Sequence, residues 1–294
     1  MTVTEGMDFA GYRIERYLGA GGMGTVFLAQ HPRLPRRDAL KILSDKHSGD
    51  PVFRARFLRE ATTAARLRHP NLVTVRDRGQ HGGHLWLAMN YVDGTDLARL
   101  IRRGPAALPL ERVVRIVAEA AEGLDALHRK GIVHRDVKPA NILIAEQDGR
   151  PDRVLVTDFG VARPAGAAAT EAGDGFAATP AYAAPELIGD GPVDRRADVY
   201  ALGCVLVELL TGAPPFPRDT PAAALWAHRH DPPPAVEKAG APRGFDDVVA
   251  TALAKDPADR YPTCRALADA ARAAAERTVR IEAAPGSARG GAGC

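Results

Sequence analysis

Cysteine is scarce in this sequence, which has three in 294 residues. Cys204, Cys264 and Cys294 are far apart and lack the short spacings of zinc ligands. Disulfide frameworks and zinc sites need cysteines in pairs or clusters, so the sequence predicts neither. This cysteine usage fits a protein of the reducing cytoplasm.

A strong charge of either sign is also lacking, since 39 Lys and Arg residues stand against 36 Asp and Glu, for a net charge of +3. A balance this near neutral gives no reason to expect a nucleic-acid or membrane-surface partner. The longest apolar run, residues 199–210, is too short to cross a bilayer and predicts a buried helix. The first residues do not have the pattern of a signal peptide. We therefore expect no transmembrane segment and no nucleic-acid partner.

Hydrophobic residues make up 46% of the chain, which is enough for a substantial core. Short apolar runs within residues 12–92, separated by Gly, Pro and charged residues, predict an antiparallel sheet with one helix at about 51–67. From residue 93 a helical periodicity replaces them. We predict an α+β protein with a small N-lobe (about 12–92) and a larger, mainly helical C-lobe (about 93–272). Helices are expected there at 110–129, 197–210, 221–230, 245–253 and from 264 to about 277.

The two ends of the chain are expected to lie outside this domain. Residues 1–11 precede the first predicted strand and form an N-terminal extension. Helical periodicity is lost from about Thr278, where Gly, Ala and Pro become frequent. Such a composition favours a flexible segment, and we assign residues 273–294 to a C-terminal tail.

Two motifs hold acids and an amide at a spacing suited to phosphoryl transfer, HRDVKPAN at 134–141 and DFG at 158–160. Asp136 could take the proton of an attacking hydroxyl, while Asn141 and Asp158 offer hard oxygen ligands for a metal that neutralises a triphosphate. Either motif alone could be a turn-rich loop with solvated charges. Their occurrence in this order, each beside β-branched apolar residues, favours the catalytic interpretation.

A glycine-rich segment and a lysine add a nucleotide site. Residues 19–24 match GxGxxG, a pattern shared with dinucleotide-binding folds, but strand-like residues on both sides predict a hairpin folded over phosphates. Lys41 lies among apolar residues, where its charge needs a partner. Glu60 on the following helix is the candidate. The alternative is that Glu60 pairs with Arg56 or Arg66 on its own helix.

Together these motifs resemble the catalytic domain of eukaryotic-type (Hanks-type) protein kinases, in particular bacterial Ser/Thr kinases, over about residues 12–272. The resemblance implies the bilobal kinase fold, with ATP and Mg²⁺ or Mn²⁺ as cofactors. In the hinge, Asn90 stands where the family usually has Glu, and backbone groups of the next two residues would recognise adenine. The nucleotide-binding positions implied are Leu18, Gly19, Ala20, Gly21, Gly22, Met23, Gly24, Val26, Ala39, Lys41, Met89, Tyr91, Val92 and Leu143.

The resemblance also implies roles for the polar residues of the site. A base, a phosphate-binding cation and metal ligands are the parts that phosphoryl transfer needs. A lysine suits the phosphates because it is a compact point charge. The family order assigns Asp136 as the base, Lys138 to the γ-phosphate, Asn141 and Asp158 to the metal, and Lys41, paired with Glu60, to the α- and β-phosphates.

Arg135, next to the expected base, indicates regulation by an anion. In the family such an arginine gathers with basic residues of the preceding lobe's helix and of the segment after DFG around a phosphorylated activation loop. Arg56 and Arg163 occupy those positions here. Three cations together need an anion to hold them, which a phosphate would supply.

The loop expected to supply that anion has few candidates. Thr170 is the single hydroxyl residue between positions 163 and 178. Our hypothesis is that Thr170 is an autophosphorylation site, or that Glu171 or Asp174 partly replaces a phosphate. The alternative is that Thr170 is inert in an Ala- and Gly-rich loop.

Residues 179–186 (TPAYAAPE) resemble the platform on which the family binds its peptide substrate, with Ala178 in place of the usual Gly. Thr179 would hydrogen-bond near the catalytic base, a pattern typical of Ser/Thr specificity. By the same resemblance Glu186 would pair with Arg260, and Asp198 would brace the backbone of the catalytic loop. These two acids would be architectural.

We predict a non-specific Ser/Thr protein kinase that transfers the γ-phosphate of ATP to protein hydroxyls, including its own, and forms a transient homodimer. The alternatives are a pseudokinase that only binds nucleotide or partners, and a kinase-like small-molecule phosphotransferase. A pseudokinase would have lost one of Lys41, Asp136, Asn141 or Asp158, and all are present. A small-molecule enzyme would usually lack the platform and the helices after it. Bacterial kinases often carry a transmembrane sensor, so this chain is a stand-alone kinase or a catalytic fragment.

Overall fold

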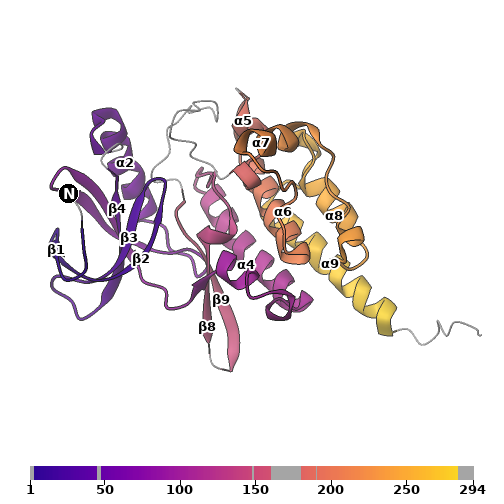
Figure 1. The fold of residues 1–294 in the computed structure, drawn as a ribbon, viewed down its shortest axis with the longest axis horizontal. Helices are drawn as coiled ribbons and strands as arrows, with labels where there is room; N and C mark the ends of the chain where they lie inside the picture. The colour runs from indigo at the N-terminus through magenta and orange to yellow at the C-terminus, as the bar shows by residue number, and fades with distance from the viewer. Residues whose placement is uncertain (1–2, 45–47, 148, 160–179, 190, 284–294) are drawn as a thin grey trace, which may run out of the picture.

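The computed structural model describes residues 3–44, 48–147, 149–159, 180–189 and 191–283. Two lobes follow one another along the chain, a curled sheet with one helix and a larger, mainly helical body (Figure 1). The predicted α+β bilobal architecture is confirmed. Arg163, Thr170 and Thr179 lie outside the described residues.

The N-lobe sheet is antiparallel, with strand order β1-β2-β3-β4-β6-β5. Strand side chains alternate between two faces, and both faces of β6 are covered. Leu85, Leu87 and Met89 pack on the inner face with the N-lobe helix, whereas Trp86 and Ala88 join an outer cluster. The strands are β1 (Asp8–Phe9), β2 (Tyr12–Gly21), β3 (Gly24–Gln30), β4 (Arg37–Leu43), β5 (Val75–His81) and β6 (His84–Asn90).

The N-terminal extension is part of this sheet, which corrects the expected start of the lobe at residue 12. Phe9 pairs with Tyr12 across β1 and β2 and is fully buried in the outer cluster. The side chain of Glu5 accepts a hydrogen bond from the backbone of Tyr17 at 3.1 Å. Burying a phenylalanine removes a large apolar surface from water, so the fold extends to residues that lack a strong strand pattern.

The N-lobe helix α2 (Pro51–Ala64) begins at Asp50, whose side chain accepts a hydrogen bond from the backbone of Val52. A proline in the first turn suits this start, because its missing N–H would have no partner there. The helix buries one face against the sheet, and Arg56 and Glu60 lie on its less buried side. The buried residues are Phe53, Phe57, Ala61 and Ala64.

The C-lobe is built around α6 (Arg196–Thr211), which is buried on nearly all sides because it is apolar nearly all round. Among the described residues, no helix is both long and apolar enough to cross a membrane. A three-stranded sheet, order β7-β8-β9, packs beside α4 (Figure 1). The other elements are β7 (Thr95–Asp96), α3 (Leu97–Ile101), α4 (Leu110–His128), β8 (Ile142–Gln147), β9 (Arg150–Val156), α5 (Pro185–Ile188), α7 (Pro221–His230) and α8 (Phe245–Ala252).

The last helix, α9 (Cys264–Ala283), continues beyond the expected end at about residue 277. The tail assigned to 273–294 is therefore wrong for its first part. Thr278 explains the extension, since the single proton of its hydroxyl is shared between the carbonyl oxygens of Arg243, at 3.1 Å, and Ala274, at 3.2 Å. These contacts anchor the helix where the sequence pattern weakens. Residues 284–294 lie outside the described part of the chain.

Candidate active site

The catalytic loop between α4 and β8 brings three predicted residues into contact. Nζ of Lys138 lies 3.0 Å from Oδ2 of Asp136. Nδ2 of Asn141 donates to the same oxygen at 3.1 Å and to the backbone carbonyl of Asp136 at 2.8 Å. A short 3₁₀ turn, Pro139–Asn141, positions the amide. Because Nδ2 makes these bonds, Oδ1 is on the opposite side of the amide group and is available to a hard cation.

Asp198, at the start of α6, braces this loop as predicted. Its carboxylate accepts hydrogen bonds from the backbone N–H groups of His134 and Arg135, both at 2.8 Å. Arg135 has a positive φ of 64°, which is uncommon for a residue with a side chain. A fully buried carboxylate therefore holds the strained backbone directly before the expected base.

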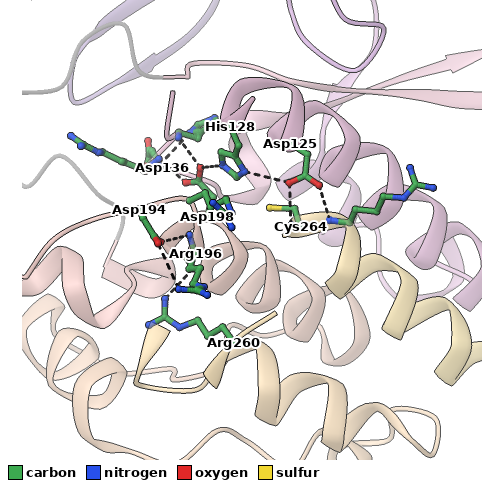
Figure 2. A network of polar contacts seen from close by, with 12 residues as sticks. Asp125, His128, Asp136, Asp194, Arg196, Asp198, Arg260 and Cys264 are labelled. Carbon is green, nitrogen blue, oxygen red and sulfur yellow. Dashed lines mark hydrogen bonds and ion pairs between the residues drawn. The ribbon is translucent and has the colours of Figure 1, made fainter. Parts of the chain in front are cut away.

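A histidine that the sequence reading did not single out completes the brace. His128 lies between Asp198, 2.7 Å from Nε2, and Asp125, 3.3 Å from Nδ1 (Figure 2). Burial alone would lower the pKa of His128, but the two carboxylates raise it to about 9. Burial would likewise raise the pKa of Asp198, and His128 lowers it. The imidazole is therefore a cation between two anions at neutral pH.

Asp125 carries the same network to the last helix. Its carboxylate accepts hydrogen bonds from the backbone N–H groups of Cys264 at 3.1 Å and Arg265 at 3.0 Å (Figure 2). An acid at the N-terminus of a helix satisfies N–H groups that have no partner within the helix. Polar contacts thus link the start of α9 through α4 and α6 to the catalytic loop.

Lys41 on β4 forms an ion pair with Asp158, with 2.9 Å between Nζ and Oδ1. Burial favours a higher pKa for Asp158, but the charge and hydrogen bond of Lys41 lower it, so the acid is ionised. Asp158 has a positive φ of 61°. The contact joins the N-lobe sheet to the segment after β9 and brings a predicted phosphate ligand next to a predicted metal ligand.

The predicted pair of Lys41 with Glu60 is not formed, which corrects the expectation. Glu60 lies beside Arg56 on its own helix, with 3.9 Å between Oε1 and Nε. Burial raises the pKa of Glu60, while the charges of Arg56, Arg59 and Arg135 lower it. Of the alternatives predicted from the sequence, the pair of Glu60 with Arg56 is the one observed. Arginines nearby attract the carboxylate, and Lys41 has a different acid as its partner.

Arg56 and Arg135 both lower the pKa of Glu60 through their charge. They are two of the three arginines that we expected to gather around an anion. Oε2 of Glu60 is buried and has no hydrogen-bond partner within the described ranges. The third arginine, Arg163, and the candidate phosphosite Thr170 lie outside those ranges. The described part of the cluster therefore already includes a side-chain carboxylate, one oxygen of which is buried.

The glycine-rich segment forms a hairpin between β2 and β3, which excludes the dinucleotide-binding interpretation. Gly21 pairs with Gly24 across a two-residue turn. Gly24 has φ 155°, and a Cβ there would lie 2.1 Å from the carbonyl oxygen of Ile42. Apart from the glycine itself and its two chain neighbours, no described residue has an atom within 4 Å of a Cβ built on Gly19, Gly21 or Gly22. The hairpin thus has open space where side chains would otherwise project, which would let a phosphate approach its backbone.

One face of the N-lobe sheet carries the predicted nucleotide wall. Val26 is opposite Lys41, and Ala39 is opposite Met89. Residues opposite each other on antiparallel strands share a face, so these four side chains lie on one side of the sheet. At the hinge, Asn90 accepts a hydrogen bond from Arg76 at 2.8 Å, which gives this departure from the family pattern a local role.

The platform residues from 180 onward are tied to the C-lobe core. Arg260 donates to both carboxylate oxygens of Glu186, at 2.7 and 2.8 Å, which confirms this predicted pair. Tyr182 donates to Glu208 on α6 at 2.6 Å. Burial raises the pKa of Glu208. The contact of Tyr182 with Glu208 has no signature in the sequence, since a lone acid on an apolar helix has no distinctive spacing.

Fold and site together define a protein kinase catalytic domain, with a glycine hairpin, a lysine, an acid–lysine–asparagine loop and a second acid between two lobes. A family profile described as "Protein kinase domain" matches residues 12–270. The chain belongs to the bacterial Hanks-type Ser/Thr protein kinases of this family.

Individual relatives agree with this assignment. The chain is 48% identical to the serine/threonine-protein kinase PknJ of Mycobacterium tuberculosis over 276 residues, 92% of this chain and 46% of PknJ. It is 47% identical to PknF of the same organism over 283 residues, 94% of this chain and 58% of PknF. It therefore spans about half the length of these curated relatives. A crystal structure of a double mutant of the M. tuberculosis PknI kinase domain matches with a TM-score of 0.77 and 41% identity, covering 94% of this chain and 100% of that domain.

Proposed function

We propose that this domain transfers the γ-phosphate of ATP to Ser and Thr hydroxyls of proteins, its own included. The observation that carries the proposal is the contact of Asp136 with Lys138 and Asn141, beside the pair of Lys41 and Asp158. A base, two cations and two metal-binding side chains at one site are the set that this reaction requires. The pseudokinase alternative is disfavoured because every member of the set is present.

In this proposal Asp136 orients the acceptor hydroxyl and takes its proton, and Lys138 neutralises charge on the transferred phosphate. The glycine hairpin and Lys41 hold the other phosphates, against the face formed by Val26, Ala39 and Met89. Holding the reactants in line contributes much of the rate enhancement in such reactions.

The divalent cofactor, Mg²⁺ or Mn²⁺, fits the donors present. Oxygen ligands are what these cations prefer, and Asn141 and Asp158 supply an amide oxygen and an ionised carboxylate. When bound, such an ion neutralises the charge of the triphosphate. The depressed pKa of Asp158 keeps its carboxylate charged without the metal, so Lys41 preserves a ligand in the form that binds cations.

We propose further that an anion of the activation loop competes with Glu60 for Arg56 and Arg135. A phosphate on Thr170 would satisfy these guanidinium groups and Arg163 together, and Glu171 or Asp174 would do so in part. Glu60 would then lose the charges that now lower its pKa. Phosphorylation of the loop would in this way change the ion pairing of Glu60 on the N-lobe helix through charge alone.

The proposed partners are protein substrates and, transiently, a second copy of the chain for phosphorylation between copies. We also propose a cytoplasmic location for the domain. Cys204 and Cys264 are free and buried, which fits a reducing compartment.

The test is incubation of the purified chain with labelled ATP and Mg²⁺ or Mn²⁺, for the wild type and for Asp136→Asn. We expect label on the wild type and a loss of about 10²- to 10⁴-fold in the variant, the range for removal of a general base. Nucleotide binding, measured by fluorescence of an ATP analogue, should be retained. The exposed Asp219→Asn serves as the matched control and should behave as wild type. Equal turnover in Asp136→Asn would refute the assignment.

A further inference from the structure

His228 on α7 is a buried histidine that the proposed chemistry does not use. It is fully buried where α7 meets α6 and the platform. Its ring packs edge-on against Phe216, with 5.0 Å between centroids. Burial lowers its pKa to about 4, so the imidazole is neutral at ordinary assay pH. A neutral imidazole has one N–H donor and one acceptor nitrogen, and the neighbours decide which is which.

Tyr200 on α6 fixes this choice. The Tyr200 hydroxyl lies 2.9 Å from Nδ1 of His228 and 3.5 Å from the His228 carbonyl. That carbonyl already accepts a hydrogen bond from Nζ of Lys255 at 2.7 Å. A hydroxyl has a single proton, so the shorter contact with Nδ1 takes it. We therefore assign Nδ1 as the acceptor and Nε2 as the nitrogen that carries the proton.

The Nε2–H group faces the platform. Within the described ranges, Nε2 of His228 is buried and has no hydrogen-bond partner. The backbone of Ala181 is near enough to oppose the lowering of the pKa by burial, yet the contact falls short of hydrogen-bond geometry. Ala181 lies in a 3₁₀ turn, Pro180–Tyr182, that contacts both α6 and α7. A buried donor without a partner is unfavourable, and a small movement of this turn would satisfy it.

We propose that His228 is a positioning residue of the peptide platform, whose Nε2–H donates to the Ala181 carbonyl when a substrate peptide is bound. Tyr200 keeps the proton on Nε2 by donating to Nδ1. The inference rests on the proposed function, because it takes residues 180–186 as part of the surface that binds the acceptor peptide. The bond stabilises the peptide-bound form of the turn, so its loss weakens acceptor binding and leaves nucleotide binding unchanged.

Two amide substitutions, each of which mimics one ring nitrogen, test this role. In His228→Gln the amide nitrogen can occupy the place of Nε2 and donate, whereas in His228→Asn it occupies the place of Nδ1. We expect His228→Asn to raise KM for an acceptor peptide about tenfold, the size expected for one lost hydrogen bond. KM for ATP should not change. His228→Gln should stay within about twofold of wild type for both constants. The peptide would be one selected with the wild type from a degenerate Ser/Thr library.

Tyr200→Phe provides an independent variant, because it removes the hydroxyl that fixes the tautomer and keeps the ring. We expect it to raise KM for the peptide in the histidine background and to have little effect in the His228→Gln background, so the two changes are non-additive. If His228→Gln and His228→Asn are equally impaired, or if KM for ATP rises together with KM for the peptide, the role is structural and the inference is wrong.

The tautomer can be observed without turnover. In the wild type labelled with ¹⁵N-histidine, the two ring nitrogens of His228 give separate signals, and a proton on Nε2 is expected. A proton on Nδ1 would overturn the inference whatever the kinetics show. Absence of labelled product with any acceptor would instead count against the proposed function, and it would leave the nitrogen signals as they are.

Discussion

Lys41 and Asp158 form an ion pair, 2.9 Å long, between the N-lobe sheet and the segment that follows β9. The pair joins residues that are far apart in the sequence and that belong to different parts of the nucleotide site. Glu60, which the sequence led us to expect as the partner of Lys41, lies beside Arg56. The relationship makes Lys41 the main group that lowers the pKa of Asp158, the proposed metal ligand.

Lys41→Met should reduce kcat by at least about a hundredfold, because the phosphates lose a positioning cation. It should also raise the pKa of Asp158, which Lys41 lowers. The acid side of the kcat/KM profile would then move to higher pH, since Asp158 would become protonated sooner. Steady-state kinetics between pH 5 and 8 measure both effects. Lys130→Met, at an exposed position, is the control, and an unmoved acid side in Lys41→Met would contradict the prediction.

His128→Gln should remove a pH-dependent part of the stability. The folded-state pKa of His128 is raised to about 9 from an ordinary 6.5, so the folded form binds this proton more tightly. Its contribution, on the order of 1 to 3 kcal/mol, is complete below about pH 6.5 and is lost as the pH rises through 9. Urea unfolding at pH 6.5 and 9 should show a larger decrease for the wild type than for the variant. The exposed His230→Gln should keep the wild-type difference.

Glu186→Gln should destabilise the C-lobe by about 3 to 5 kcal/mol, because it leaves the buried Arg260 charge without its compensating carboxylate. Arg260 donates to Glu186 through two hydrogen bonds, at 2.7 and 2.8 Å. The exposed pair of Arg13 and Asp8 offers the control, and Asp8→Asn should change stability by less than about 1 kcal/mol. Chemical denaturation measures both. If the two substitutions changed the free energy of unfolding by similar amounts, the buried pair would stabilise the domain no more than the exposed pair, and the prediction would be wrong.

Thr170→Ala should lower activity if the activation loop is regulated by a phosphate. Phosphopeptide mapping of the autophosphorylated wild type should then place a phosphate on Thr170, and the variant should have lower kcat with little change in KM for ATP. The physical reason is that Arg56 and Arg135 would remain with Glu60 in the absence of a second anion. A fully active variant, together with no phosphate found on the loop, would dispose of the hypothesis.

Much of the site could be predicted because its parts are local motifs with fixed chemistry. Asp136, Lys138 and Asn141 are within six positions of one another, and the short turn after Lys138 brings their side chains together. The brace from Asp198 and the pair of Glu186 with Arg260 followed from the order of motifs. In these cases a sequence spacing is enough to specify a contact.

Other features depend on which of several charged side chains becomes the ion-pair partner of a given residue, and the sequence alone does not show this. Whether Glu60 pairs with Lys41 or Arg56 is decided by the positions of arginines from two lobes, and Asp158 competes for the same lysine. His128 lies on the apolar face of its helix, where a histidine is most simply taken for a core residue. His228 acquires its role only through Tyr200 and Ala181, which meet it across three separate elements.

The burial of Phe9 has a practical consequence for anyone who prepares this domain. The family profile begins at Tyr12, so a recombinant chain cut at that point would seem to preserve every element that the family shares. It would nevertheless lose β1 and open the outer cluster of the N-lobe sheet to solvent. β2 forms one side of the glycine hairpin. Looser packing around β2 would therefore make the proposed phosphate-binding turn of the hairpin less well ordered. Low activity of such a trimmed chain would then reflect the missing N-terminal residues more than the chemistry of the active site.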